Sequence, residues 1–487
     1  MSLTRTIPMP RTEESPRRQL LLWGIILVEA LTLGIPWKWW GIAGISLVAL
    51  LALLGLFLSL LRGRAENLIL AWVLIFPLGY YFLSYPRESI VISFDRVMVL
   101  AAVLAVAFAR PSETVRVPAL MLRAGVVWAI FLAAAAISLV HLPNPLGGTK
   151  LWWDAFVLPA LLGFCIIRSF DVRRFLPWLH LMTCLFAIYS VLIGIAEFVL
   201  NTDLLPLPSG TFYSVGETSS LVPRVNGPFA TNTSYALIGL IAFLLLVFVR
   251  REMPERIALW RSLLHWLGVS AACLMAVMTL FRSVLLTLVV ILVLDTFLTK
   301  GLRARILRMS ILMVLLIGGI AFQILVPDVS EERSDPQNIY GRIAQQKQTL
   351  EVFLTHPITG IGLGNFLTFA PEFVGTAEFR GYDPVDAPHN NVGQIFAETG
   401  IAGGIPYVWT QMILLAAFWK VRHRNSPSSR RIWIFFLYIF LSYWISGLSL
   451  SSGFYPDLNL WFILALAVLY KFALTEKTTP VLQIAHI

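Results

Sequence analysis

The densest group of polar side chains in this sequence lies in the stretch DAPHNNVGQIFAETGIAGG, residues 386–404, between apolar segments. His389 stands near its start, followed by two asparagines and then by Glu398. An imidazole titrates at about pH 6.5, so at an aqueous surface it can accept a proton at neutral pH and act as a general base. A histidine that caps a helix or only makes a hydrogen bond would give the same pattern. Spacing alone leaves both interpretations open.

Two arginines and an aspartate lie at the predicted ends of apolar segments. Arg224 stands in PRVNGPFATNTS, Arg282 in LFRSVLL and Asp457 in SSGFYPDLN. A guanidinium group stays charged when partly buried, and its planar fork matches diphosphate and carboxylate groups. The alternative is that these side chains only reach toward lipid headgroups.

A glycine series follows a stretch that predicts a surface helix. In IYGRIAQQKQTLEVFLTHP, apolar residues at helical spacing predict an amphipathic helix along the membrane surface, which should end before Pro357. These residues are Tyr340, Ile343, Leu350, Phe353 and Leu354. Gly360, Gly362 and Gly364 come next and could cradle a phosphate, although no strand precedes them as in a dinucleotide-binding fold. The alternative is a tight turn that requires small residues.

A metal site is a further alternative. Asp383, Asp386 and His389 are spaced by three residues, and His356 lies upstream. Prolines interrupt the helical spacing, and neither an HExxH nor a paired DxD pattern is present, so the sequence gives little support for a metal hydrolase. Serine-nucleophile motifs of the GxSxG type are also absent.

The elements that position these residues are membrane helices. The 487 residues are 58% hydrophobic and 13% charged, against about 25% charged residues in a soluble domain. Apolar runs long enough to span a bilayer predict an all-α polytopic membrane protein with about 12–14 transmembrane helices. The expected organisation is a tail at 1–19, eleven helices over 20–326 with an outer loop at 201–234, a large outer loop at 327–400, three helices over 401–471 and a tail at 472–487. The three cysteines form no CxxC pair, which argues against a disulfide framework or a thiolate metal site.

The distribution of charge predicts the orientation. Most of the 37 basic residues fall in alternate loops and in the two termini, and positive loops stay cytoplasmic. Both termini are therefore expected in the cytoplasm, and both large loops on the periplasmic face. The net charge of +10 reflects this topology, so we expect no nucleic-acid partner.

Acidic residues within apolar runs suggest a transporter or flippase as another class, because charges inside a membrane are often functional. They are Glu29, Asp95, Glu197 and Asp295. Asp95 is followed directly by Arg96, and Asp295 is near an inner end, which leaves two without an evident explanation. A large outer loop is also unusual for a transporter.

The run GRIAQQKQTLEVFLTHPITGIGLGNF, followed by HNNVGQIFAETGIAGG, resembles the signature region of the O-antigen ligase and polymerase superfamily. That pattern is approximately R…P-x-x-G-x-G-x-G-N-F…H-N…E-x-G-x-x-G. RVNGPFATNTSYA is similar to the family's earlier outer-loop motif, and FRSVLL to its arginine at the outer end of a span.

The resemblance implies a glycosyltransferase of the bacterial inner membrane, with its active site on the periplasmic face and with no metal or cofactor. It implies that His389 is the general base and that Arg224 and Arg282 bind the diphosphate of the donor. Arg342 and Asp457 are further candidates, the first for diphosphate or sugar and the second as an orienting partner. Asn390 and Glu398, which match the motif, are candidate substrate contacts.

The implied donor is an undecaprenyl-diphosphate-linked oligosaccharide, and the acceptor is either another glycan or lipid A–core. The phospholipid bilayer and a chain-length regulator are further expected partners. Two features favour a polymerase of O-antigen or exopolysaccharide repeat units over a ligase. The fourteen helices of this organisation exceed the twelve typical of the ligases. The segments predicted to face outward carry a net negative charge, which is unfavourable for a phosphorylated acceptor. The ligase and the transporter remain alternatives.

Overall fold

The computed structural model describes residues 65–82, 85, 90–108, 117–142, 145–201, 204–205, 225–253, 258–279, 281–298, 305–306, 308–310, 312–313, 336–384, 388–423 and 426–476. The chain divides into two compact units, Met1–Arg62 and Gly63–Ile487. All of the first unit lies outside the described residues, as do the predicted spans near 20–36 and 41–61 and most of a predicted span at 309–326. Every described helix therefore belongs to the second unit.

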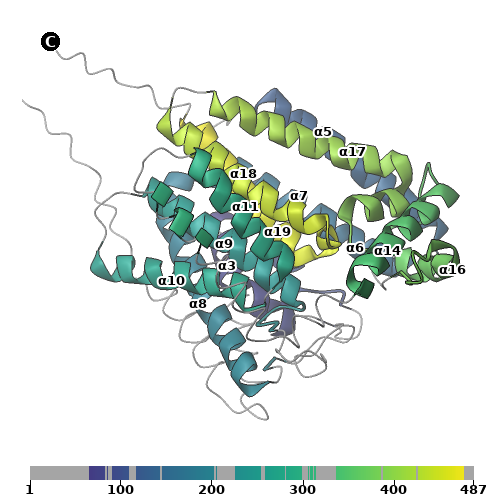
Figure 1. Cartoon of the computed structure of the whole chain (residues 1–487). Helices are drawn as coiled ribbons and strands as arrows, with labels where there is room; N and C mark the ends of the chain where they lie inside the picture. The colour runs from purple at the N-terminus through teal and green to yellow at the C-terminus, as the bar shows by residue number, and fades with distance from the viewer. Residues whose placement is uncertain are drawn as a thin grey trace, which may run out of the picture. The chain divides into compact units, whose positions relative to one another are not determined.

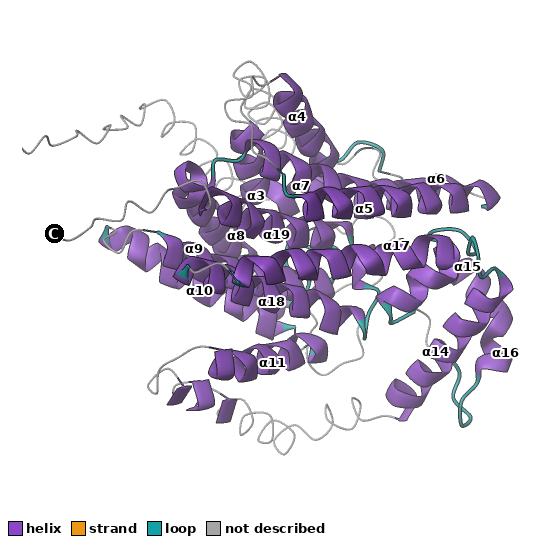
Figure 2. Ribbon diagram, turned by 90° about the horizontal axis from the view of Figure 1, so that it is seen from above, coloured by secondary structure: helices purple, strands orange, loops and turns teal. Residues whose placement is uncertain are grey.

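The protein is an all-α polytopic membrane protein, as the sequence predicts (Figures 1 and 2). Seven helices of the described part are long and apolar enough to cross a membrane. The longer helices are α3 (Ala65–Phe82), α4 (Phe94–Phe108), α5 (Ala119–Ser138), α6 (Pro145–Leu151), α7 (Leu158–Ser169), α8 (Val172–Leu200), α9 (Asn232–Glu252), α10 (Leu259–Met278), α11 (Arg282–Leu298), α14 (Pro336–Thr355), α17 (Asn391–Arg422), α18 (Pro427–Gly447) and α19 (Pro456–Glu476). Short helical turns lie between them, among them α15 (Phe366–Phe369) and α16 (Val374–Ala377).

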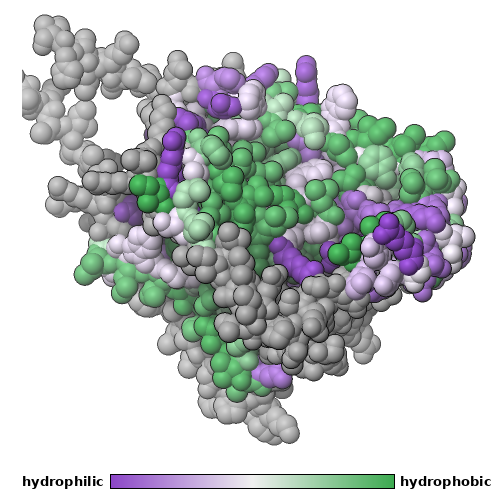
Figure 3. All heavy atoms as spheres, viewed as in Figure 1, coloured by the Kyte–Doolittle hydropathy of each residue, from purple (hydrophilic) through white to green (hydrophobic). Residues whose placement is uncertain are grey.

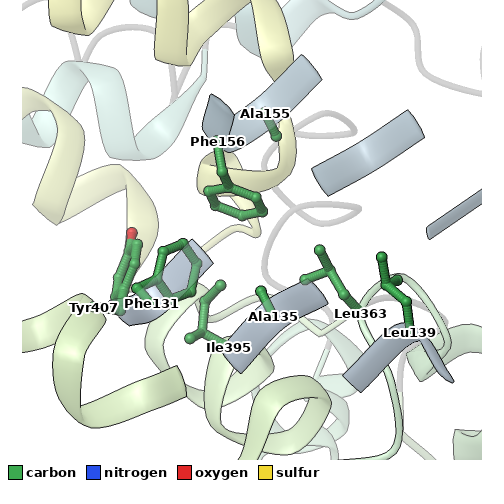
Figure 4. Close-up of a cluster of buried hydrophobic side chains, with 8 residues drawn as sticks. All are labelled: Phe131, Ala135, Leu139, Ala155, Phe156, Leu363, Ile395 and Tyr407. Carbon is green, nitrogen blue, oxygen red and sulfur yellow. The ribbon is translucent and has the colours of Figure 1, made fainter. Parts of the chain in front are cut away.

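Helix α5 packs along α17, and an aromatic cluster fills the space between them and the start of α7 (Figure 4). The rings of Phe131 and Phe156 meet edge to face at 5.1 Å, and Tyr407 of α17 lies 5.4 Å from Phe131. Leu363 of the glycine-rich loop and Ile395 of α17 belong to the same cluster. The core of the helix bundle therefore extends directly under the segment that carries the sequence motif.

A six-residue π-helical stretch, Trp152–Val157, joins α6 to α7. Such a stretch leaves backbone carbonyls free for other partners. The Ala155 carbonyl accepts a hydrogen bond of 2.8 Å from the Asn459 amide, and Asp154 receives a two-pronged ion pair from Arg96 of α4, with Nε at 2.6 Å. The stretch thus ties α4 and α19 to the bundle.

The acidic residues of the spans have structural partners where the structure describes them. Asp95 and Arg96 do not pair with each other as their adjacency in the sequence suggests. Arg96 binds Asp154, and Asp95 accepts a hydrogen bond of 2.6 Å from the Trp72 indole. Asp295 pairs with Arg308 and with the Tyr438 hydroxyl. These partners weaken the transporter interpretation.

The surface in Figure 3 separates by polarity. Apolar side chains cover the region of α11 and α18, and hydrophilic ones gather over α14 and α16. On this face, the segment that includes α14 and α16 is therefore a polar region beside a broad apolar one.

Candidate functional site

The loop after α14 is a tight turn built on glycine. Gly360, Gly362 and Gly364 have positive φ angles of 72°, 101° and 80°, which other residues rarely adopt. A Cβ on Gly360 would lie 2.3 Å from the Glu398 carbonyl oxygen, and one on Gly362 would lie 2.3 Å from a Leu142 methyl group. These close contacts explain the glycine spacing in physical terms.

The backbone N–H groups of this loop are all used by the protein itself. The Gly360 N–H donates to His356 O, and the Asn365 N–H donates to Gly362 O. The Leu363 N–H donates to Ser138 Oγ. Ile361 and Gly362 donate to the backbone carbonyls of Ala397 and Glu398 at 3.1 and 2.9 Å. The Glu398 carboxylate takes the two that remain, from Gly364 and Phe366. The loop is therefore a turn that requires small residues, not a phosphate cradle.

Glu398 is the residue that holds this turn in place. Its side chain is fully buried, with Oε2 2.7 Å from Gly364 N and Oε1 2.9 Å from Gln394 Nε2 and 3.3 Å from Phe366 N. Both carboxylate oxygens are thus occupied within the protein. This arrangement supports a structural role for Glu398, and the substrate contact expected from the motif stays a prediction.

Helix α17 is broken at Gly400, where φ is 61° and ψ is −166°. The break frees two N–H groups, and Ile401 and Ala402 donate them to the carbonyls of Pro357 and Ile358 at 2.8 and 3.1 Å. A Cβ on Gly400 would lie 2.2 Å from Ile358 O. The glycine-rich loop and the break therefore fit into each other, which fixes the short helix that begins at Asn391.

His389 lies just before this short helix and is held from two sides. Its backbone N–H donates to Gln345 Oε1 of α14 at 3.0 Å. On the other side, Pro388 O accepts from the Ser451 hydroxyl, and Asn391 Oδ1 accepts from Gly453 N at 2.6 Å. The imidazole thus sits where α14, α17 and the α18–α19 turn meet.

Asn390 caps the short helix. Its Oδ1 accepts a hydrogen bond of 3.1 Å from Gly393 N, and its amide donates to Gln346 Oε1 at 2.9 Å. These contacts connect α17 to α14 and satisfy the side chain, as expected for an N-cap residue.

Two arginines carry positive charge to this place. Arg342 of α14 is close enough to His389 to contribute to the lowering of its pKa, and Arg282, the first residue of α11, acts in the same way on Arg342. Both arginine side chains are exposed. Burial is the main cause that lowers the His389 pKa from 6.5 to about 4, and Arg342 adds to it. The imidazole is therefore neutral, and able to accept a proton, at physiological pH.

The other predicted site residues lie elsewhere or outside the described part. Arg224 is outside the described residues. Asp457, at the start of α19, accepts hydrogen bonds from Leu458 N at 2.8 Å and from the Ser234 side chain, so its contacts lead to α9. Buried Glu197 accepts a hydrogen bond of 2.6 Å from Gly227 N, a glycine with a positive φ angle of 56°, and so holds the turn at Gly227 much as Glu398 holds the glycine-rich loop.

The metal alternative gains no geometric support from the described residues, among which no three His, Cys, Asp or Glu side chains form a group that could hold an ion. His356 is exposed and contacts Thr355 Oγ1 at 3.0 Å and the Phe369 ring. Asp386 is outside the described part.

Sequence reasoning missed the two glutamines of α14. Gln345 is fully buried and positions the backbone of His389, and Gln346 binds Asn390. A signal was present, because the AQQKQ segment places a glutamine on the face of the helix that packs against the protein. A buried amide usually has a specific partner to satisfy.

The fold and the site together define an integral membrane protein in which a neutral histidine lies within the field of exposed Arg342, on which Arg282 acts in turn. Residues 267–408 match the family model described as O-antigen ligase. The match confirms the resemblance to the O-antigen ligase and polymerase superfamily and supports a function of the ligase or polymerase type. It includes Arg282, Arg342, His389 and Glu398. No curated protein matches the chain.

Proposed function

We propose that this protein is a metal-independent glycosyltransferase that moves a glycan from undecaprenyl diphosphate to an acceptor hydroxyl. The proposal rests on the half-buried His389, whose pKa the charge of Arg342 helps to lower, and on Arg282, whose charge acts in turn on Arg342; all three belong to the matched region. A neutral base beside fixed positive charge is what transfer from a diphosphate donor needs.

In the reaction, the His389 imidazole takes the proton of the acceptor hydroxyl. The resulting oxygen nucleophile attacks the anomeric carbon of the donor sugar, and a new glycosidic C–O bond forms. The bond from that carbon to the diphosphate oxygen breaks, and its electron pair leaves with undecaprenyl diphosphate. Arg282 and Arg342 stabilise the negative charge that develops on the leaving group, which lowers the barrier. The proton on His389 then passes to solvent, which restores the neutral imidazole.

Polymerisation of O-antigen or exopolysaccharide repeat units is the specific reaction that we favour. The segments predicted to face the periplasm carry a net negative charge, which suits a growing glycan better than phosphorylated lipid A–core. Ligation of the glycan to lipid A–core is the main alternative. A polysaccharide transporter has less support, because the acids of the spans that the structure describes, Asp95, Glu197 and Asp295, have structural partners.

The first test uses purified protein, a lipid-diphosphate-linked repeat unit and EDTA, with the products resolved on a gel. A ladder of lengthening chains identifies a metal-independent polymerase. A single transfer that requires lipid A–core identifies a ligase. If no product forms with either acceptor, the proposed function is contradicted and the transporter becomes the favoured alternative.

Replacement of Arg282 with alanine is expected to lower the transfer rate by about 10²–10³-fold, the usual loss when one group that stabilises developing negative charge is removed. Arg282→Lys should recover part of the rate, because it keeps the charge but not the planar fork. The rate of product formation at saturating donor is the measurement. Arg380→Ala is the matched control, since Arg380 is also exposed but contacts Tyr340 and Phe379 instead. Equal losses in the two variants would contradict a specific role of Arg282.

The acid limb of the pH profile should report His389. Since its pKa is lowered to about 4, the free enzyme holds the base form above that pH, and kcat/KM should decline only as the pH falls through about 4. Arg342→Gln removes a positive charge that disfavours the imidazolium, so the limb should move to higher pH, toward 6.5. Lys347→Gln, which removes another exposed cation of α14, is the control and should leave the limb in place. If the acid limb of Arg342→Gln had the same pH as that of the unchanged protein, the charge of Arg342 would have no part in the titration of His389.

A further inference from the structure

Helix α14 has two faces that differ in their surroundings. The face turned to the protein is buried and includes Ala344, Gln345, Gln348, Thr349 and Val352. The opposite face carries an apolar stripe of Ile339, Ile343, Leu350 and Leu354, with exposed fractions between 41% and 61%. These four residues are separated by four, seven and four positions, so they share one face over about 22 Å of helix. We call them the α14 stripe.

The stripe differs from the apolar face that the sequence pattern suggests. Phe353 packs against Phe396 with ring centroids 6.0 Å apart, and Tyr340 lies against the Phe379 and Tyr382 rings and Arg380. Both rings are therefore engaged within the protein, and Ile339 joins the exposed set in their place. What remains exposed is purely aliphatic, and no described residue of the chain covers it.

Further exposed apolar residues lie between the end of α14 and a candidate membrane span. Beyond the end of α14, Ile358 is 65% exposed, and its carbonyl binds Ala402 N at 3.1 Å. Next to Ala402, the exposed residues Ile401, Ile405 and Trp409 follow at intervals of four along α17, a candidate membrane span. An apolar surface thus runs from the side of a spanning helix onto α14, which lies at the end where α17 begins (Figure 2).

Charge is placed to match lipid headgroups. Arg342 and Lys347 are both exposed and lie along opposite edges of the stripe. An amphipathic helix with an aliphatic face and basic edges is the pattern of a helix that lies in the interface of an anionic bilayer.

From these observations, we infer that the α14 stripe docks on the outer surface of the lipid bilayer, with the opposite face of α14 holding His389. Docking in this way places the exposed Arg342 side chain at the level of lipid phosphates. The inference concerns the position of α14 and holds whether or not the transfer reaction does.

The test is site-directed spin labelling in nanodiscs that contain anionic phospholipid. In a background with the three native cysteines replaced, a nitroxide is attached at Ile343→Cys or at Leu350→Cys. Ile405→Cys serves as the lipid reference, and Glu378→Cys, at an exposed polar position of the same loop, as the water reference. Collision rates are measured with oxygen, which concentrates in lipid, and with a water-soluble nickel chelate.

Both stripe positions are expected to show an oxygen-to-nickel ratio several-fold above that of Glu378→Cys and close to that of Ile405→Cys. A ratio equal to that of Glu378→Cys would overturn the inference, because the stripe would then face water. Low collision rates with both reagents would also overturn it, since they would show that a second copy or another protein covers the stripe. The labels replace exposed side chains, but Cys165 and Cys184 are buried. The unfolding temperatures of the cysteine-free background and of each labelled variant are therefore compared with that of the unchanged protein, and only variants that keep it are scored.

Discussion

Replacement of His389 with alanine is expected to lower glycan transfer by about 10²–10⁴-fold, the contribution usually made by a positioned general base. The acceptor hydroxyl must lose its proton as it attacks, and among the groups gathered at this site the neutral imidazole is the one suited to take it. Its low pKa ensures that the base form predominates at neutral pH. The loss should appear in kcat with either acceptor, because both ligation and polymerisation require this step.

The matched control is His356→Ala, because His356 is an exposed histidine at the other end of the same loop. Its activity should stay close to that of the unchanged protein. The variants are compared by the initial rate of product formation and by their unfolding temperatures. Activity retained by His389→Ala would exclude this residue as the base, and an equal loss in both variants would point to a general effect on the loop.

Binding of the donor should change the titration of His389. The diphosphate brings negative charge next to Arg342, which offsets the positive field that helps to lower the pKa of the histidine. The acid limb of kcat, which reports the substrate complex, is therefore expected at higher pH than the limb of kcat/KM. A base that is weak in the empty site can thus become stronger when the donor is bound.

Some features of the site follow from local rules. Asn390, which the resemblance made a candidate substrate contact, follows Pro388 and precedes an apolar helical pattern, and it caps the helix in line with the N-cap preference. Gly400 likewise falls where the short helix ends and the spanning helix begins, since only glycine readily takes its backbone angles. Such features depend on a few neighbouring residues, so the sequence contains what is needed to predict them.

The features that could not be predicted from the sequence depend on packing between distant segments. Asp95 and Arg96 are neighbours in sequence, but adjacent residues of a helix point in different directions and do not face each other. Arg96 therefore reaches Asp154 on another helix, and the Trp72 indole takes Asp95. In the same way, Gln345 is identified as a partner of His389 only by the packing of α14 against the start of α17. Periodicity alone predicts neither contact.

Replacement of Glu398 with alanine should have the largest effect on stability. It removes the acceptor of hydrogen bonds from Gly364 N, Phe366 N and Gln394 Nε2, of which the last two are buried and Gly364 is exposed. Each buried donor left without a partner costs about 1–3 kcal/mol, so the two buried donors give a total of about 2–6 kcal/mol. Glu398→Gln should cost less, because its remaining oxygen can still accept the bonds from Phe366 and Gln394, while only Gly364 faces a donor.

Two measurements separate this structural role from a direct role in substrate binding. Thermal unfolding should shift most in Glu398→Ala, less in Glu398→Gln and little in Glu372→Ala, whose side chain is exposed. Hydrogen exchange of the Gly364 and Phe366 amides should accelerate in the same order, because these are the amides that the carboxylate binds. If Glu398→Ala instead abolished transfer while unfolding and exchange stayed unchanged, Glu398 would belong among the groups that touch the substrate. The expected order would establish that Glu398 and the glycines of this motif build the turn. The contacts with the substrate would then be left to His389 and the arginines.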